Sequence, residues 1–285
     1  MKKLSLFLAV ILLVTGCAKK EALVPVRVHV NDFSISQEDF PSKTAVSDYN
    51  GVKAITLAFY KEDGAQQCCY TQLRADESSY ITFGDFECSL PMGSYTMVVL
   101  GYGLKEGEPA ITLNSLTEAT FGSYPVRETF VATQTVNVNN TQPLTLNAEL
   151  NRVVARVNVK STDGRPETVE TLRVTFSGGG KGLNPLTGLA TSNAGFFNTL
   201  QPTVAVGTPT NMINYLFLNT DEQTMNLTIE ALNYDGDVVF QKEVDNVPMK
   251  RNRITVLSGQ MYTAGSSSAF TINTDYIADT AFVMF

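Results

Sequence analysis

The sequence has few of the residues on which most enzyme active sites depend. Its 285 residues include no tryptophan and a single histidine, His29. Hydrolytic triads and most catalytic metal sites use histidine as a base or a ligand, and His29 alternates with valines in a run that predicts a solvent-facing strand position. A pair of catalytic carboxylates of the glycosidase type is the alternative that stays open, although the Asp and Glu residues are scattered and nothing in the sequence marks such a pair. We therefore predict that the protein is not an enzyme and has no catalytic residue, metal or cofactor.

Basic residues are also scarce. The chain has 21 Lys and Arg against 28 Asp and Glu, a net charge of −7, whereas nucleic-acid binding depends on Lys and Arg that neutralise phosphates. A small basic cluster at residues 250–253 is interpreted as a turn before a strand. The glycine-rich segment 177–182 lacks the spacing of a phosphate-binding loop and is interpreted as a connection between strands. The sequence thus predicts no nucleic-acid partner.

Long apolar runs are missing except near the N-terminus. Two lysines precede an uncharged run from Leu4 to Val14, which is the pattern of a secretory signal peptide and is shorter than the about 20 residues of a membrane-spanning helix. The run ends in Val14-Thr15-Gly16-Cys17, which resembles a bacterial lipobox. We expect residues 1–16 to be the signal peptide, Cys17 to be lipidated and residues 17–22 to form a linker. The alternative is an ordinary signal peptide with an incidental cysteine.

Only three other cysteines are present, Cys68, Cys69 and Cys88. Export would place them in an oxidising compartment, where a disulfide can persist. If residues 66–71 form a strand, Cys68 and Cys69 point to opposite faces, so that either Cys68 or Cys69, and not both, can pair with Cys88. Three reduced, half-buried thiols are the alternative, and the sequence leaves both possibilities open.

Alternation of apolar and polar residues occurs along almost the whole chain. Val24, Val26, Val28 and Val30 alternate with polar residues and predict a strand with one buried face. No amphipathic helix of three turns is evident, and Asp-Gly pairs within 62–64, 162–164 and 234–237 predict hairpin turns. Short strands separated by turns indicate an antiparallel, all-β sandwich or barrel. Further strands are predicted at 52–60, 95–102, 133–138, 144–160, 170–176, 225–232, 238–244 and 254–261.

The length that remains after a signal peptide is enough for two domains. One β pattern closes at Leu150 and another opens at Asn151 without a flexible linker, so we expect closely coupled domains at 23–150 and 151–265. A serine run then separates the tail 266–285, which contains two apolar clusters, Phe270 with Ile272 and Phe282 with Met284. Such a tail can pair within its own domain, which periodicity alone favours, or add to a sheet edge of a neighbouring subunit.

Several segments occur in an order that resembles the fimbrillin family of Bacteroidia, which comprises type V pilus subunits and their anchor proteins. These segments are the lipobox at Cys17 and residues 58–64, 90–95, 152–157 and 246–262. The resemblance covers nearly the whole mature chain. It implies two tandem transthyretin-like β-sandwich domains, export as a lipoprotein with a palmitate anchor, and a location in the outer membrane, at the cell surface or in a fimbria.

The resemblance also implies roles for both ends of the chain. Val24, Val26, Val28 and Val30 resemble the first strand that a protease removes from stalk precursors, and Phe270, Ile272, Phe282 and Met284 resemble the donor segment that fills the groove of another subunit. Stalk precursors are cut after an arginine behind the first strand, whereas residues 37–51 here contain Lys43 and no arginine. An uncleaved anchor and a subunit cut by a protease of other specificity both remain open.

Two functions are therefore expected from the sequence. The first is a structural subunit or basal anchor of a surface fimbria that assembles with other fimbrial subunits by β-strand exchange and contributes to adhesion to a host or bacterial surface ligand. The alternative is a glycan-binding surface lipoprotein. Sugar rings usually stack on aromatic side chains, and with no tryptophan present that role would fall to tyrosines. The candidates are Tyr80, Tyr95, Tyr102 and Tyr124.

Overall fold

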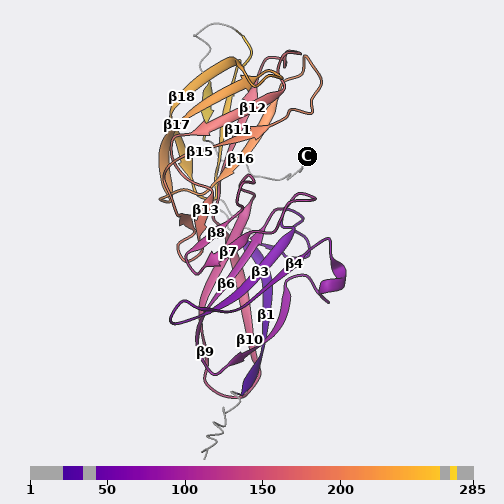
Figure 1. Ribbon diagram of the computed structural model, residues 1–285, viewed down its shortest axis with the longest axis vertical. Helices are drawn as coiled ribbons and strands as arrows, with labels where there is room; N and C mark the ends of the chain where they lie inside the picture. The colour runs from indigo at the N-terminus through magenta and orange to yellow at the C-terminus, as the bar shows by residue number, and fades with distance from the viewer. Residues whose placement is uncertain (1–21, 35–42, 264–269, 275–285) are drawn as a thin grey trace, which may run out of the picture.

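The computed structural model describes residues 22–34, 43–263 and 270–274. Its strands lie in two groups along the long axis, with the N-terminal strands at one end and the C-terminal strands at the other (Figure 1). The only helical element in the described residues is one short 3-10 turn, Glu77–Ser79. The predicted all-β class is therefore confirmed. Cys17, Phe282 and Met284 lie outside the described residues, as do the signal peptide and most of the tail.

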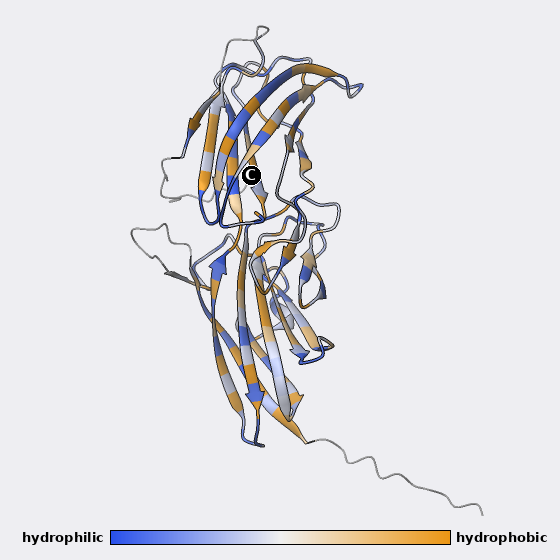
Figure 2. Ribbon diagram, turned by 90° about the vertical axis from the view of Figure 1, so that its left-hand side faces the viewer, coloured by the Kyte–Doolittle hydropathy of each residue, from blue (hydrophilic) through white to orange (hydrophobic). Residues whose placement is uncertain are grey.

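The N-terminal half is built from one eight-stranded sheet. Its order is β2-β1-β10-β9-β6-β3-β4, and β5 pairs with β1 beside this path. The sheet curls around its own core, to which β1, β3, β4, β5, β6, β9 and β10 contribute side chains, and apolar and polar residues alternate along the ribbons (Figure 2). The strands are β1 (Leu23–Ser34), β2 (Lys43–Ala45), β3 (Ala54–Lys61), β4 (Gln66–Leu73), β5 (Asp85–Pro91), β6 (Gly93–Tyr102), β9 (Thr129–Val138) and β10 (Leu144–Arg152).

The C-terminal half consists of two four-stranded sheets around a second core. Their orders are β16-β11-β19-β20 and β15-β12-β17-β18, and both sheets contribute side chains to that core. The strands are β11 (Ala155–Ser161), β12 (Thr171–Phe176), β15 (Phe196–Leu200), β16 (Asn211–Leu216), β17 (Glu222–Leu232), β18 (Val238–Lys250), β19 (Ile254–Gly259) and β20 (Thr271–Asn273).

A small sheet, the shared sheet, joins the two halves. It has the order β14-β13-β8-β7, in which β7 (Thr112–Ser115) and β8 (Glu118–Thr120) come from the N-terminal half and β13 (Gly182–Asn184) and β14 (Leu189–Ala190) from the C-terminal half. Leu183 pairs with Ala119 across it. Both side chains belong to a third apolar cluster that also contains Val153 and Val154, where the chain passes from one half to the other.

Two strand pairs depart from the predicted antiparallel arrangement. β1 runs parallel to β10, and β11 runs parallel to β19. Parallel neighbours require a long connection, and here most of each half lies between the two partners in sequence. Alternation in the sequence identifies the buried face of a strand and carries no information about its direction or its partner.

The predicted turns are correct in part. Asp63-Gly64 and Asp235-Gly236 close the β3–β4 and β17–β18 hairpins, with both glycines at positive φ. The expected hairpin at 162–164 is wrong, because β11 pairs with β16 and β19 whereas the following strand β12 lies in the opposite sheet. The predicted single strand 144–160 is also two strands, β10 and β11, which belong to different halves.

A buried ionic cluster lies where β10 leaves the N-terminal half. Arg152 Nη2 is 2.7 Å from Glu128 Oε1, and the Tyr49 hydroxyl donates to Glu128 at 2.8 Å. The Arg152 guanidinium also lies over the Phe130 ring, 5.4 Å from its centroid. Burial raises the pKa of the Tyr49 hydroxyl, and the neighbouring Glu128 carboxylate adds to the shift. The buried charges of Arg152 and Glu128 therefore neutralise each other at the end of the N-terminal core that lies next to the shared sheet.

Candidate interaction surfaces

The first strand is held along both of its edges. β1 pairs in parallel with β10 from Val26 to Ser34, and on its other side it pairs with β5 from Leu23 to His29. The side chains of Val24, Val26, Val28 and Val30 all lie in the N-terminal core. The candidate removable strand is thus an integral strand of the sheet, and its removal by a protease stays a prediction.

The outer face of β1 forms an ion pair and a hydrogen bond with β5. Arg27 Nε is 3.0 Å from Glu87, and His29 Nδ1 is 2.8 Å from Asp85. Both pairs join residues directly opposite one another in the β1–β5 ladder. His29 therefore lies on the outer face, as its alternation with valines predicts, and Arg27 lies in the middle of a paired strand, where a protease has poor access to the backbone.

The described part of the tail pairs with its own half. β20 lies beside β19 at the edge of one C-terminal sheet, with Ile272 opposite Leu257. Phe270 is 9% exposed and belongs to the C-terminal core. A Cβ on Gly259 would lie 3.1 Å from Phe270, so glycine allows this close approach. Phe270 and Ile272, predicted as part of a donor segment, thus occupy an edge position in their own subunit, and their donation to another subunit stays a prediction.

Asp163 fixes the segment that leads into the tail. Its carboxylate accepts hydrogen bonds from the backbone N–H of Met261 at 2.8 Å and of Tyr262 at 2.7 Å, and from the Thr263 hydroxyl at 3.1 Å. Tyr262 is also anchored by its hydroxyl, 2.7 Å from Thr210 Oγ1. The Asp-Gly pair that was expected to form a hairpin instead holds the chain after β19.

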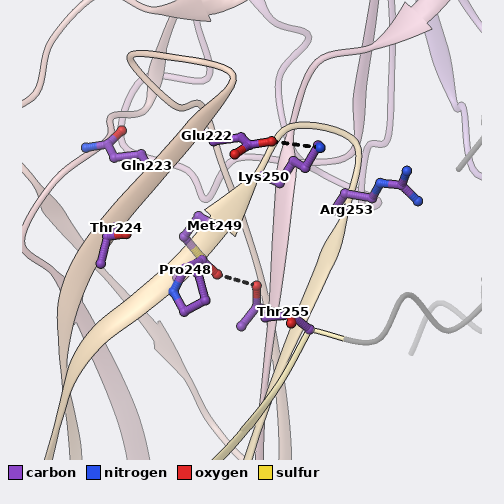
Figure 3. Close-up of a pocket in the computed structure, with 9 residues that line it drawn as sticks. Glu222, Gln223, Thr224, Pro248, Met249, Lys250, Arg253 and Thr255 are labelled. Carbon is purple, nitrogen blue, oxygen red and sulfur yellow. Dashed lines mark hydrogen bonds and ion pairs between the residues drawn. The ribbon is translucent and has the colours of Figure 1, made fainter. Parts of the chain in front are cut away.

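A hollow of about 250 Å³ lies between β17, the β18–β19 turn and the end of β20. Within it Lys250 Nζ pairs with Glu222 at 2.7 Å, and the Thr255 hydroxyl donates to the Pro248 carbonyl at 2.7 Å (Figure 3). The basic segment 250–253 is the turn that the sequence predicts. The hollow offers hydrogen-bonding groups to a polar ligand or an extended chain. Its lining residues are Glu222, Gln223, Thr224, Pro248, Met249, Lys250, Arg253, Thr255 and Thr274.

A second hollow, of about 290 Å³, lies between β15 and the loop around Ser123. Phe197 on its wall is 59% exposed, and Tyr124 in the loop is 38% exposed. Lys181 Nζ donates to the Ser123 carbonyl at 3.0 Å, and burial lowers the pKa of this ammonium group. An exposed aromatic ring beside polar side chains is a surface on which a sugar or another planar ligand can stack.

The tyrosines proposed for sugar stacking are mostly unavailable. Tyr95 and Tyr102 are buried, so their predicted role is wrong. Tyr80 is half-buried and packs against Phe83. Phe197 was missed, although the adjacent Phe196 and Phe197 form a recognisable signal. Neighbouring strand residues face opposite sides of a sheet, and here Phe196 stacks on Phe176 while Phe197 faces outward.

The structure distinguishes between the two adjacent cysteines. Cys68 and Cys88 both pack against the N-terminal core, and their side chains are in hydrogen-bonding contact. Cys69 is exposed and faces the other side of β4. All three are free thiols in the structure. Of the two predicted pairings, the arrangement therefore favours Cys68 with Cys88, and a disulfide stays a prediction.

The described residues contain no cluster of metal ligands and no candidate membrane-spanning helix. Across 22–34, 43–263 and 270–274, no three His, Cys, Asp or Glu side chains gather closely enough to hold a metal ion. No helix in this part of the chain is long and apolar enough to cross a membrane.

Solved structures share this fold at low sequence identity. A candidate adhesin from Bacteroides ovatus superposes with a TM-score of 0.51 and 13% identity, over 80% of this chain and 83% of the other. A candidate polysaccharide-binding protein from Bacteroides thetaiotaomicron gives a TM-score of 0.51 and 13% identity, over 90% and 99%. The fimbrial anchor protein Mfa2 from Porphyromonas gingivalis gives 0.48 and 14%, over 90% and 99%.

No curated protein matches the chain. The fold is shared with candidate adhesins of Bacteroides, and membership of the fimbrillin family itself is not shown. Because one family model matches residues 26–283, the chain belongs to that family, a family of unknown function designated DUF6562.

Proposed function

We propose that this protein acts at the cell surface in adhesion or in the assembly of fimbriae, by binding other molecules and not by catalysis. The observation that carries the proposal is the fold, which extends over 80% of the chain and is shared with a candidate adhesin. The ordered motifs that resemble fimbrillins, from the lipobox to residues 246–262, support the fimbrial form of this role.

The finer proposal is a lipid-anchored protein of the outer membrane that keeps its first strand. Lipidation at Cys17 rests on the lipobox-like sequence, and anchoring of this kind is stable when more than one acyl chain is present. Retention of β1 is supported by its pairing with both β10 and β5. The absence of arginine from residues 37–51 also supports it. Together these features favour a basal anchor or an uncleaved surface receptor.

Intact-mass and N-terminal analysis of the native protein tests this finer proposal. The protein would be purified from the outer-membrane fraction and from filaments sheared off the cell surface. We expect a chain that begins at an acylated Cys17 and stays with the membrane. A chain that begins beyond Val30 in sheared filaments would contradict retention of β1 and indicate a processed stalk or tip subunit.

Strand exchange through the tail requires a variant that spares the protein's own core. Phe270 packs in the C-terminal core and β20 pairs with β19, so deletion of the whole tail would also remove native contacts. Deletion of residues 275–285 leaves these contacts in place. If the tail donates a strand, this truncated protein keeps the melting temperature of the wild type but no longer forms ladders of oligomers or captures another subunit. Unchanged assembly would exclude a donor role for residues 275–285.

A glycan-binding role is the second candidate, and the hollow beside β15 is the observation that favours it. Phe197 is exposed there next to Lys181 and Thr199. A glycan array followed by titration with any bound oligosaccharide tests the role. Phe197→Ala should weaken binding by about tenfold or more if the ring stacks on a sugar. Tyr234→Ala, at a 91% exposed tyrosine on the β17–β18 turn, is the control and should not change binding. An array without hits would exclude this candidate.

A further inference from the structure

The eight-stranded sheet has two edge strands that no backbone ladder joins. Among the described residues, β5 pairs only with β1, and β4 pairs only with β3. Because the sheet curls around one core, these two edges approach each other. The seam between them is bridged by side chains.

Gln72 bridges one end of the β4–β5 seam. Its side-chain amide donates to the Asp85 carbonyl at 2.6 Å, and its side-chain oxygen accepts from the Gly84 N–H at 2.8 Å. Gln72 therefore provides, through its side chain, the hydrogen bonds that a backbone ladder would otherwise make between the end of β4 and the start of β5.

Cys68 and Cys88 occupy the other end of the same seam. Gln72 contacts Gly84. Cys68 lies four residues before Gln72 along β4, and Cys88 lies four residues after Gly84 along β5. The two cysteines therefore lie opposite each other in one antiparallel register. Both pack against the N-terminal core, and their thiols are in contact. Side chains as short as cysteine can touch only where their backbones come close together, which a disulfide also requires.

We propose that Cys68 and Cys88 form a disulfide that closes the seam between β4 and β5, while Cys69 stays a free thiol on the other face of β4. The inference goes beyond the proposed function and rests on it only for export to an oxidising compartment. Its consequence is local. β5, which pairs with β1, gains a covalent attachment to the opposite edge of the sheet.

The two thiols have different parts in the reaction. A hydrogen bond from Cys88 lowers the pKa of the Cys68 thiol, and the same hydrogen bond, together with burial, raises the pKa of Cys88. The Cys68 thiolate attacks one sulfur of an oxidant disulfide, and the other oxidant sulfur leaves as a thiolate. Cys88 then loses its proton and attacks Cys68 Sγ, which releases the second oxidant thiolate. The two electrons and two protons pass to the oxidant, a protein of the dithiol–disulfide oxidoreductase class in the cell or oxidised glutathione in vitro.

Peptide mapping without reductant tests the pairing. The full-length protein is either purified from the cell surface or equilibrated with oxidised glutathione, alkylated in denaturant and digested with trypsin. Cleavage after Lys61, Arg74 and Lys105 places Cys68 and Cys69 in peptide 62–74 and Cys88 in peptide 75–105. We expect these peptides to be joined in the wild type and in Cys69→Ser, and to be separate in Cys68→Ser and Cys88→Ser.

Two outcomes would overturn the proposal. One is a wild-type protein whose two peptides remain separate after glutathione equilibration. The other is a Cys68→Ser variant in which the peptides are still joined, because Cys69 would then be the partner. Separate peptides in the cell-surface sample alone, with joined peptides after glutathione treatment, would contradict export to an oxidising compartment and leave the pairing geometry supported.

A second readout measures what the disulfide does. Closing a loop of this length should raise the melting temperature of the oxidised protein over the reduced protein by roughly 5 to 10 °C. Backbone amides of β5 should exchange hydrogen at least about tenfold more slowly when the protein is oxidised. Cys69→Ser should keep both differences and Cys88→Ser should lose them. Equal exchange in the two redox states would show that the bond does not hold β5.

Discussion

The strands at the two ends of the described chain are held very differently. β1 has twelve residues, paired edges on both sides and four valines in the core. β20 has three residues and, within the part of the chain that the structure describes, pairs with β19 on one side, with Ile272 36% exposed. Phe270, just before β20, supplies the main contact of this segment with the C-terminal core.

This difference leads to a prediction about the cost of releasing each strand. Releasing β1 would expose an apolar groove and two rows of backbone groups, which is a costly edge. Releasing β20 would expose one short edge and the Phe270 site. We therefore predict that β20 leaves its sheet at a lower cost than β1, and variants in β1, at the buried ion pair, in the shared sheet and at β20 test this prediction.

The largest effect is expected in β1. Val28→Asp places a carboxylate among buried apolar side chains without a partner, which should cost more than about 4 kcal/mol in the free energy of unfolding. Denaturant unfolding followed by fluorescence and limited proteolysis measures it. His29→Ser changes the neighbouring, outward residue and loses only the partly exposed pair with Asp85, so we expect at most about 1 kcal/mol. Equal midpoints for the two variants would show that β1 is not integral.

The second largest effect is expected at the buried ion pair between Arg152 and Glu128, next to the point where the chain passes from one half to the other. Arg152→Met leaves Glu128 charged and buried without its cation, which typically costs about 3–5 kcal/mol. Arg173→Met breaks the pair between Arg173 and Glu230 and is the matched control. The Arg152 and Glu128 side chains are 8% and 5% exposed, whereas those of Arg173 and Glu230 are 32% and 11% exposed. Because water screens the second pair, we expect a loss of at most about 1 kcal/mol there. Urea titration measures both, and similar losses would contradict the assigned burial.

The sequence alone identifies the long, alternating strands and not their partners. The β1 valines are predicted correctly as one buried face, and Gly64 and Gly236 are correctly placed in hairpin turns. The strands of the shared sheet are two to four residues long, too short to show a period. The sequence also does not predict that β1 pairs with β10 and β11 with β19 in parallel, because pairing between distant segments depends on the whole topology.

The candidate sites show the same limit. Adjacent Cys68 and Cys69 can be assigned to opposite faces from sequence, but only the seam register shows that Cys68 meets Cys88. The Asp163 carboxylate resembles an ordinary turn residue until the segment after β19 is folded against it. Tyr95 and Tyr102 are predicted as surface aromatics, but both are buried on β6, Tyr95 in the N-terminal core and Tyr102 in the third cluster.

The shared sheet should show a smaller effect with a distinct signature. Leu183 is fully buried in the third cluster, and Leu183→Ala should cost about 2–4 kcal/mol. Because this cluster joins the halves, the variant should also split one unfolding transition into two, as measured by calorimetry. Leu186→Ala, at a 43% exposed leucine nearby, is the control and should leave the transition unchanged. A single, uniformly shifted transition for Leu183→Ala would show that the halves do not depend on this contact to unfold together.

The smallest effects are expected at β20. Phe270 sits at the edge of its core, so Phe270→Ala should cost only about 1–2 kcal/mol, less than the usual 3–5 kcal/mol for a central phenylalanine, and Ile272→Ala should cost less than about 0.5 kcal/mol. Hydrogen exchange at β19 would rise in the first variant and hardly change in the second, since Phe270 packs beside Gly259 at the end of that strand. If Phe270→Ala instead destabilised the protein as much as Val28→Asp, the tail would be as integral as β1. The two ends of the chain would then be equivalent, and exchange of the tail would carry the same cost as exchange of the first strand.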